Sequence, residues 1–219
     1  YGVQATIQIE NDNAVDFYGH YGDLAWAVPE DSGKMRVGLC SRLKTRKLFD
    51  VFVKKYSGKI LDWQGGLIPI YDPKLKTSGR LESDGEDNLF LVGDAAGMIK
   101  ATTAGGIIQS MKAGKVLADC IATGKDYDKE WRKVIGRDLW LHLQLRHIMD
   151  KFSLRDWDGL VDAFQRDSLK KVLGSVSRDN MSKLVFKIVK ANPKLLLYSR
   201  KLFSSTIWEK NYEAVLNQE

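Results

Sequence analysis

The first forty residues of the chain alternate between apolar and polar side chains in short stretches rich in β-branched and aromatic types. Turns containing Asn, Asp, Gly or Pro separate these stretches, which cover residues 3–9, 14–18, 24–28 and 34–40. Such alternation is typical of strands with one buried face. We therefore predict an antiparallel meander at the start of the chain.

Residues 43–57 change to helical spacing, with apolar side chains three or four positions apart and Gly58 as a C-terminal stop. Residues 60–71 return to an extended pattern. Gly65 and Gly66 interrupt it, at a place where the backbone bends or is closely approached. The pattern predicts one helix and one further strand here.

The middle of the chain holds a polar loop and then a short apolar run. Residues 72–88 are polar and contain Gly and Pro, so we predict a long, weakly ordered loop. The apolar run at residues 88–93 predicts a buried strand, and a helix is expected from about residue 104 to residue 123.

Beyond residue 126 apolar side chains keep helical spacing almost to the end, with breaks near residues 153, 174–178, 192–193 and 204–205. Strands first and helices last are typical of an α+β fold. We predict four segments: an antiparallel sheet portion (1–71), a polar loop (72–88), a strand and helix (89–125) and a helical region (126–219).

Composition limits the class of protein. Hydrophobic residues make up 44% of the 219 residues, which is enough for a compact core. No apolar run reaches the roughly 18 residues that a membrane span needs. The only cysteines, Cys40 and Cys120, lack the paired spacing of a metal site or disulfide framework. A cytoplasmic location is predicted.

The net charge of +6 lies mostly in the second half of the chain. Residues 166–210 contain 11 Lys and Arg against 3 Asp and Glu, interleaved with apolar residues. This pattern predicts either basic helices lying on an anionic membrane surface or solvated helices packed on the core. Charge alone does not choose among lipid head groups, nucleic acid and a phosphorylated substrate.

Residues 89–107 carry the clearest candidate chemistry. Gly93 and Asp94 follow the predicted strand at its carboxyl end, where ligands bind in open α/β sheets. The next helix opens with paired glycines, so its free N–H groups and positive dipole end face the same place. An Asp in this position is also a common cap or turn residue. The candidate residues are Gly93, Asp94, Ala95, Gly97, Thr103, Gly105, Gly106 and Ile107.

This segment resembles the second FAD motif of flavoproteins of the para-hydroxybenzoate hydroxylase type, in which Gly-Asp-Ala-Ala precedes a glycine-rich helix start. The resemblance implies an α/β-type FAD-binding fold, present here in part. It also implies that Asp94 binds the ribityl hydroxyls, and that N–H groups of Gly105, Gly106 and Ile107 lie near the pyrimidine edge of the flavin. A positive helix end there favours the anionic reduced cofactor.

Within that superfamily the chain resembles the geranylgeranyl reductases over roughly residues 1–125. The similar stretches are residues 1–4, 25–29, 37–39 and 65–69. In the flavin segment the chain departs from the family pattern: Lys100-Ala101 replaces a common Asn-Pro, and Ala104 replaces the first of three glycines.

The resemblance implies an FAD-dependent reductase of carbon–carbon double bonds in isoprenoid lipids of the geranylgeranyl type. Such an enzyme needs an apolar slot that aligns the alkene and excludes water. The candidates for lining it are Trp26, Val28, Pro29 and Trp63, although plain sheet core is the alternative for these side chains. Val28 stands where the family pattern has Phe.

Other functions share these features. A flavin monooxygenase or an electron-transfer flavoprotein could carry the same Gly-Asp motif, and a non-catalytic truncated relative could bind a membrane surface or a partner. The sequence contains no Gly-x-Gly-x-x-Gly motif. In Rossmann-type flavoproteins this motif binds the dinucleotide. We therefore expect the amino-terminal half of the same protein as a partner. The electron donor is not specified, and nucleic acid is not an expected partner.

Overall fold

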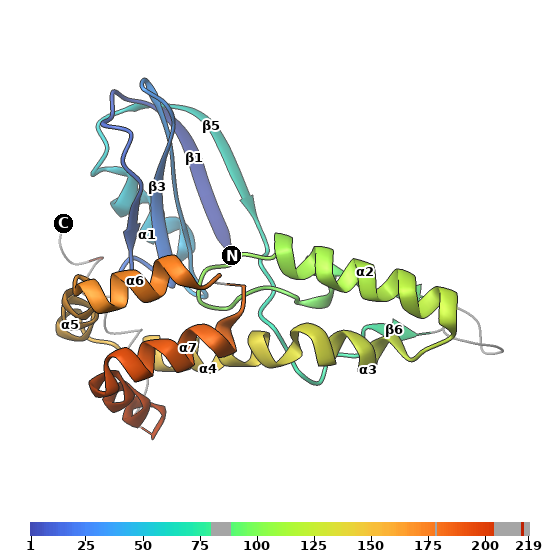
Figure 1. Ribbon diagram of the computed structural model, residues 1–219. Coiled ribbons are helices and arrows are strands. Elements are labelled where there is room, and N and C mark those ends of the chain that lie inside the picture. Colours follow the sequence, from blue (N-terminus) through green and yellow to red (C-terminus); the bar gives the residue numbers. More distant parts are fainter. Residues whose placement is uncertain (80–88, 178, 204–215, 217–219) are drawn as a thin grey trace. The chain divides into compact units, whose positions relative to one another are not determined.

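The computed structural model describes residues 1–79, 89–177, 179–203 and 216, which group into two compact units (Figure 1). The first unit comprises Tyr1–Ile68, Asp150–Val161 and the described residues from Phe203 onward. The second comprises Pro69–Met149 and Asp162–Leu202. The fold is α+β, as the sequence predicts.

An antiparallel sheet of five strands builds the first unit. In spatial order the strands are β2 (Asp16–Tyr18), β3 (Leu24–Asp31), β4 (Lys34–Cys40), β1 (Gly2–Gln8) and β5 (Lys59–Gly66). All neighbouring pairs are antiparallel. The predicted strands are confirmed with small changes in their bounds. The predicted meander of four strands holds only for β2, β3 and β4, because β1 pairs with β4 instead of β2, and β5 lies at the edge beside β1.

Helix α1 (Thr45–Val53) covers one face of this sheet. Ala5, Val37 and Leu39 on that face are fully buried, and they belong to the same core cluster as Phe49 and Phe52 of α1. Burying a side chain the size of Phe stabilises a fold by about 1.5–3 kcal/mol. Because neighbouring strand residues point to opposite faces, the remaining positions of these strands form a second face.

Arg42 ties the sheet to the segment that precedes α5 (Leu154–Phe164). Its Nη2 lies 2.6 Å from Oδ1 of both Asp23 and Asp150. The Asp150 side chain is only 5% exposed, and the Arg42 guanidinium gives this buried carboxylate an oppositely charged partner. The ion pairs explain why Asp150–Val161 groups with the sheet although it is distant in sequence.

The second unit is mainly helical. Its elements are β6 (Ser78–Gly79), β7 (Leu89–Phe90), the 3-10 turn η1 (Gly93–Ala96), α2 (Ile107–Thr123), α3 (Tyr127–Trp131), the π-helical turn η2 (Arg132–Gly136), α4 (Arg137–Met149), α6 (Asp167–Ser175), α7 (Met181–Ala191) and the 3-10 helix η3 (Pro193–Phe203). One core cluster includes Tyr71, Met98 and Trp131. A second includes Met181 and Leu184 of α7.

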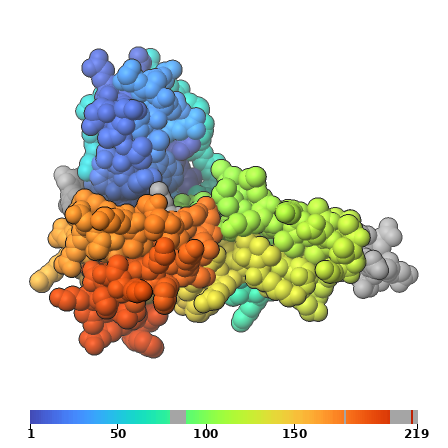
Figure 2. Space-filling model, viewed as in Figure 1, coloured from blue at the N-terminus to red at the C-terminus, as the bar shows by residue number. Residues whose placement is uncertain are grey.

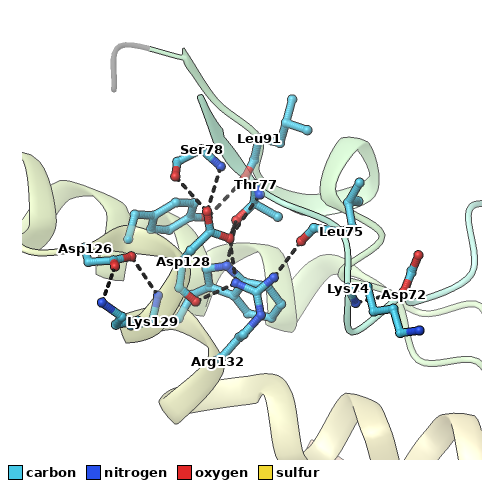
Figure 3. Close-up of polar contacts among 12 residues, drawn as sticks. Asp72, Lys74, Leu75, Thr77, Ser78, Leu91, Asp126, Asp128, Lys129 and Arg132 are labelled. Atoms are coloured by element: carbon cyan, nitrogen blue, oxygen red, sulfur yellow. Dashed lines mark hydrogen bonds and ion pairs between the residues drawn. The ribbon is translucent and has the colours of Figure 1, made fainter. Parts of the chain in front are cut away.

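A polar network fastens β6 to α3, as Figure 3 shows. The Asp128 carboxylate accepts hydrogen bonds from the backbone N–H of Thr77 and Ser78 at 3.0 and 3.1 Å. It also accepts one from Arg132 Nη1 at 2.5 Å. Burial opposes ionisation, but the hydrogen bonds from Arg132, Ser78 and Thr77 outweigh it and hold the pKa of Asp128 well below its usual range. These contacts therefore hold the described end of the residue 72–79 segment against α3.

Three sequence predictions need correction in the second unit. The strand predicted at residues 88–93 is only two residues long, and Leu89 is 43% exposed because its neighbour in the described chain is the equally short β6. The predicted loop 72–88 contains β6 in its described part. A break between α5 and α6 was not predicted. The rest of that loop, residues 80–88, and the break expected at residues 204–205 lie outside the described residues.

The helices from residue 127 onward follow the predicted spacing. The segment from Tyr127 to Met149 is a continuous helical run through the turn η2, and the described chain breaks near residues 153, 174–178 and 192–193 as expected. Within residues 1–79, 89–177 and 179–203, no helix is both long and apolar enough to cross a lipid bilayer.

Candidate cofactor-binding site

Two glycines with left-handed backbone conformation enclose the turn η1. Gly93 has φ +67° and Gly97 has φ +63°, a region that side chains other than Gly enter at a cost of about 1–2 kcal/mol. The N–H of Gly97 donates to the Asp94 carbonyl at 2.9 Å, and the N–H of Met98 donates to the Gly93 carbonyl at 3.0 Å. Met98 is buried while Asp94 is exposed, so the tight turn presents the Asp94 carboxylate at the surface.

The loop of residues 100–106 then closes on itself before α2 begins. The Lys100 N–H donates to the Gly105 carbonyl at 3.0 Å, and the Lys100 carbonyl accepts from the N–H groups of Thr103 and Ala104 at 3.1 and 2.9 Å. Ala104 has φ +53°, which is incompatible with a helix. The predicted helix start at Ala104 is therefore wrong, and α2 begins at Ile107.

The turn η1 and the start of α2 meet at Asp94 and Gly106. A Cβ atom on Gly106 would lie 2.8 Å from Asp94 Oδ1, and one on Gly93 would lie 2.8 Å from Ser110 Oγ. Both glycines are thus needed for close approach. The Asp94 carboxylate stands beside the helix N-terminus, where free N–H groups and the helix dipole favour negative charge.

This arrangement fits the cofactor role that the sequence predicts. The Asp94 side chain makes no hydrogen bond to any described residue, so its two oxygens are available as acceptors. Ile107, at the first position of α2, is 78% exposed, and the first amides of a helix have no intrahelical partners. The acceptor oxygens of Asp94 and the free N–H groups at the start of α2 therefore lie close together, beside a glycine that leaves room for a ligand.

The structure brings some predicted residues together and leaves others at the margin. Gly93, Asp94, Gly106 and Ile107 converge as described above. Gly105 is half-buried, and a Cβ atom there would lie 3.0 Å from Lys100 Cε. The remaining candidates flank the site: Gly97 is buried below the turn, whereas Ala95 and Thr103 are exposed.

Sequence reasoning missed the groups that hold the loop from behind. Lys100 Nζ lies 2.8 Å from Asp179 Oδ1, and Thr102 Oγ1 lies 2.7 Å from His142 Nδ1. Each pair is widely separated in sequence, by 79 and 40 positions. No local pattern could have identified them.

The predicted lining of the substrate slot divides between the two faces of the sheet. Trp26 lies in one row with Gly38, Gln4 and Gln64 of the neighbouring strands. Trp26 Nε1 donates to Gln4 Oε1 at 3.3 Å, and Gln4 Nε2 donates to Gln64 Oε1 at 2.6 Å. By strand alternation Val28 shares this face, whereas Pro29, paired with buried Met35, lies on the core side.

Trp63 belongs to the face that α1 covers. Its ring centroid lies 5.2 Å from that of Phe49, and the Arg46 guanidinium carbon lies 4.4 Å from the Trp63 ring centroid. The structure does not bring Trp63 together with Trp26. Beside Trp26 there is instead a depression of about 290 Å³ with Gln4, Gln64, Leu67 and Ile68 in its lining.

Comparisons with known proteins point to one group of enzymes. A digeranylgeranylglycerophospholipid reductase of Methanosarcina acetivorans is 30% identical over 210 residues, which cover 86% of this chain and 48% of that protein. Digeranylgeranylglycerophospholipid reductase 1 of Methanothermobacter thermautotrophicus is 34% identical over 213 residues, with 90% and 52% covered. The chain spans about half the length of the curated relatives it matches. No family model matches it.

A solved structure shares the fold. The crystal structure of a geranylgeranyl bacteriochlorophyll reductase-like protein from Thermoplasma acidophilum matches with a TM-score of 0.64 and 22% identity. The match covers 92% of this chain and 54% of that one. The likeness extends over both units of the described chain.

Proposed function

Because the chain belongs to the geranylgeranyl reductase family, we propose that it works as part of an FAD-dependent reductase of carbon–carbon double bonds. The proposed substrates are isoprenoid lipids of the geranylgeranyl type, as the names of the relatives indicate for those proteins. The observation that carries the cofactor part is the approach of Asp94 Oδ1 to Gly106 at the start of α2. The Asp94 carboxylate, which accepts hydrogen bonds, and the first N–H groups of α2, which donate them, lie there within reach of one ligand.

In this proposal the chain holds the ribityl chain and ring system of FAD. Asp94 accepts hydrogen bonds from the ribityl hydroxyls, while N–H groups of Gly105, Gly106 and Ile107 bind the pyrimidine edge. When bound, FAD would supply the electrons and hydrogen that reduce a double bond. The positive end of α2 favours negative charge on a ligand at this place, so the protein contributes orientation and electrostatics.

The substrate is proposed to contact the sheet face that carries Trp26 and Val28. A flat indole and a branched aliphatic side chain suit a methyl-branched apolar chain because both offer large apolar area. Trp63 is omitted from this proposal because its ring packs on the α1 side. Pro29 pairs with Met35 and lies on the core side of the sheet. It is next to the proposed slot only because it follows Val28 in the chain.

The helical region supplies a proposed contact with an anionic membrane. Residues 181–203 contain six Lys and Arg and no Asp or Glu, and Figure 2 shows α7 and η3, coloured orange to red, at the molecular surface. Met181 and Leu184 face the core, so the helical repeat turns Lys183, Phe186 and Lys190 outward. Phe186 is 69% exposed, which gives this basic face an apolar side chain that can enter the lipid interface.

Extraction of the bound cofactor tests the flavin part of the proposal. The full-length gene product should purify yellow, and denaturation should release FAD, identified by its mass and by its gain of fluorescence after phosphodiesterase treatment. Protein that stays colourless after incubation with FAD, while remaining folded by circular dichroism, would contradict the proposal. FMN in place of FAD would also contradict it.

A further inference from the structure

The loop that precedes α2 is strained and is fastened by residues far away in sequence. Ala104 adopts φ +53°, a left-handed conformation that favours glycine. The backbone hydrogen bonds within the loop are supplemented by two contacts with residues that are distant in sequence.

Lys100 makes the strongest of these contacts. Its Nζ lies 2.8 Å from Asp179 Oδ1, with the two side chains only 17% and 25% exposed. Partial burial reduces the screening of such a pair by solvent. The hydrogen bond from Lys100 lowers the pKa of Asp179, which favours the ionised carboxylate at neutral pH. Asp179 also accepts at its backbone carbonyl from Lys112 Nζ of α2 at 3.2 Å.

The same lysine organises the part of the loop that leads into the candidate site. Its backbone N–H and carbonyl bind Gly105, Thr103 and Ala104, and its Cε lies 3.0 Å from the position of a Cβ atom on Gly105. A displaced Lys100 would release these three hydrogen bonds together. The amides of Gly105 and Gly106 would then lose their fixed direction.

A second contact holds the loop at Thr102. Thr102 Oγ1 lies 2.7 Å from Nδ1 of His142, whose ring is 1% exposed on α4. Burial, helped by the charge of Lys100, lowers the pKa of His142 to about 4, so the ring is neutral at neutral pH. The loop thus rests on one ion pair and one neutral hydrogen bond, both from the helical region.

We propose that Lys100 is a positioning residue whose ion pair with Asp179 fixes the loop of residues 100–106 so that the first amides of α2 meet the cofactor. Asp179 lies two residues before α7, so the same pair joins the cofactor loop to the helix that carries the basic outer face. The inference rests on the proposed function, because it assigns the amides to FAD. It adds a loop residue, Lys100, that positions the amides and does not itself bind the cofactor.

Four variants test this role in the full-length gene product. Lys100→Met and Asp179→Asn each remove the ion pair, and Lys100→Asp combined with Asp179→Lys restores it in reverse. Lys115→Met is the matched control because Lys115 is an exposed lysine of α2. Thermal unfolding by circular dichroism identifies any variant that fails to fold, and such a variant is replaced by Lys100→Gln.

The first readout is hydrogen–deuterium exchange of residues 100–107 without added cofactor. We expect exchange at least about tenfold faster in both single variants, because an opened loop no longer protects its amides, and recovery in the charge-reversed pair. The second readout is FAD affinity with the midpoint potential of the bound flavin. Affinity should fall by about tenfold and the potential should shift in the single variants, whereas Lys115→Met should match the parent in both readouts.

Unchanged exchange in the single variants would overturn the fastening role of the ion pair. Faster exchange with unchanged affinity and potential would overturn the cofactor role of the loop. A parent protein that takes up no flavin would contradict the proposed function and this role with it. That failure is recognisable because the exchange difference, measured without cofactor, would still be present.

Discussion

Asp94 illustrates how far single residues could be predicted. The Gly-Asp pattern and the following glycines are local in sequence, so their meeting at the start of α2 could be anticipated. Lys100, Asp179 and His142 could not, because their contacts depend on how distant helices pack. The sequence also could not predict that Trp26 and Trp63 lie on opposite faces of the sheet. Alternation shows which residues of one strand share a face, but it does not show which face of the edge strand β5 packs against α1.

Replacing Asp94 with Ala should weaken FAD binding in the full-length gene product. The change deletes the acceptor of the ribityl hydroxyls and leaves those groups unpaired in the site, a loss of about 1–3 kcal/mol. Asp119→Ala, which removes an exposed carboxylate elsewhere on α2, is the control. Equilibrium dialysis with FAD measures both, and equal affinity for the two variants would remove Asp94 from the site.

Replacing Gly106 with Val should also impair binding, because a Cβ atom there would stand 2.8 Å from Asp94 Oδ1 and force the carboxylate aside. Gly114 on the same helix has nothing within 4 Å of its Cβ position. Gly114→Ala should therefore leave flavin affinity unchanged and stabilise the helix by about 0.5–1 kcal/mol. Flavin spectra and affinities that are the same for Gly106→Val and the parent would argue against this geometry.

At the scale of elements, hydrophobic periodicity located the strands and helices well and their ends less well. The first four strands follow simple alternation and were predicted nearly as they occur. The start of α2 was misplaced by three residues because Ala104, a good helix former, is held at positive φ by the turn around Lys100. The strand at residues 88–93 was overestimated because apolar composition does not reveal whether a sheet neighbour is present.

The contact between α4 and the cofactor loop should depend on pH. The pKa of His142 is lowered from 6.5 to about 4 by burial and by Lys100. Between about pH 6.5 and pH 4 the His142 ring is therefore protonated in the unfolded chain and neutral in the folded chain. The contribution of His142 to stability is therefore fully present above about pH 6.5 and is lost as the pH falls toward 4.

Urea unfolding from about pH 7 down to about pH 4.5 measures this effect. The parent should lose stability over this interval, and His142→Gln should lose clearly less, although it starts from a lower value. His147→Gln is the control because His147 is exposed on the same helix. If the stability of the His142 variant and the parent fell in parallel, the buried neutral ring would not be the cause.

At the scale of the whole molecule, the chain combines a cofactor loop, a sheet face that carries Trp26 and Val28, and a basic helical face. The proposed reduction of a lipid requires access to a membrane, and we propose that the basic face of α7 and η3 provides the docking contact. The chain should sediment with vesicles that contain anionic phospholipid more than with neutral ones. Salt should release it, because each Lys or Arg contributes about 1 kcal/mol that is screened over a Debye length.

Charge reversal locates the docking face. A triple variant in which Lys183, Lys190 and Lys194 become Glu should lose vesicle binding. A control triple variant at exposed lysines outside α7 and η3 should keep most of it; the control positions are Lys59, Lys74 and Lys76. Equal losses in the two variants would indicate a general charge effect, and binding that ignores lipid charge and salt would contradict a docking face.

The central claim is reduction of isoprenoid double bonds, and the mass of the lipid product tests it most directly. The full-length gene product, loaded with FAD and supplied with dithionite under anaerobic conditions, is incubated with a geranylgeranyl lipid, and the product is analysed by mass spectrometry. The account predicts a gain of two hydrogens for each double bond reduced, with Asp94→Ala much slower than the parent at low FAD. Unchanged lipid under these conditions, or a product that gains oxygen when air is admitted, would contradict it.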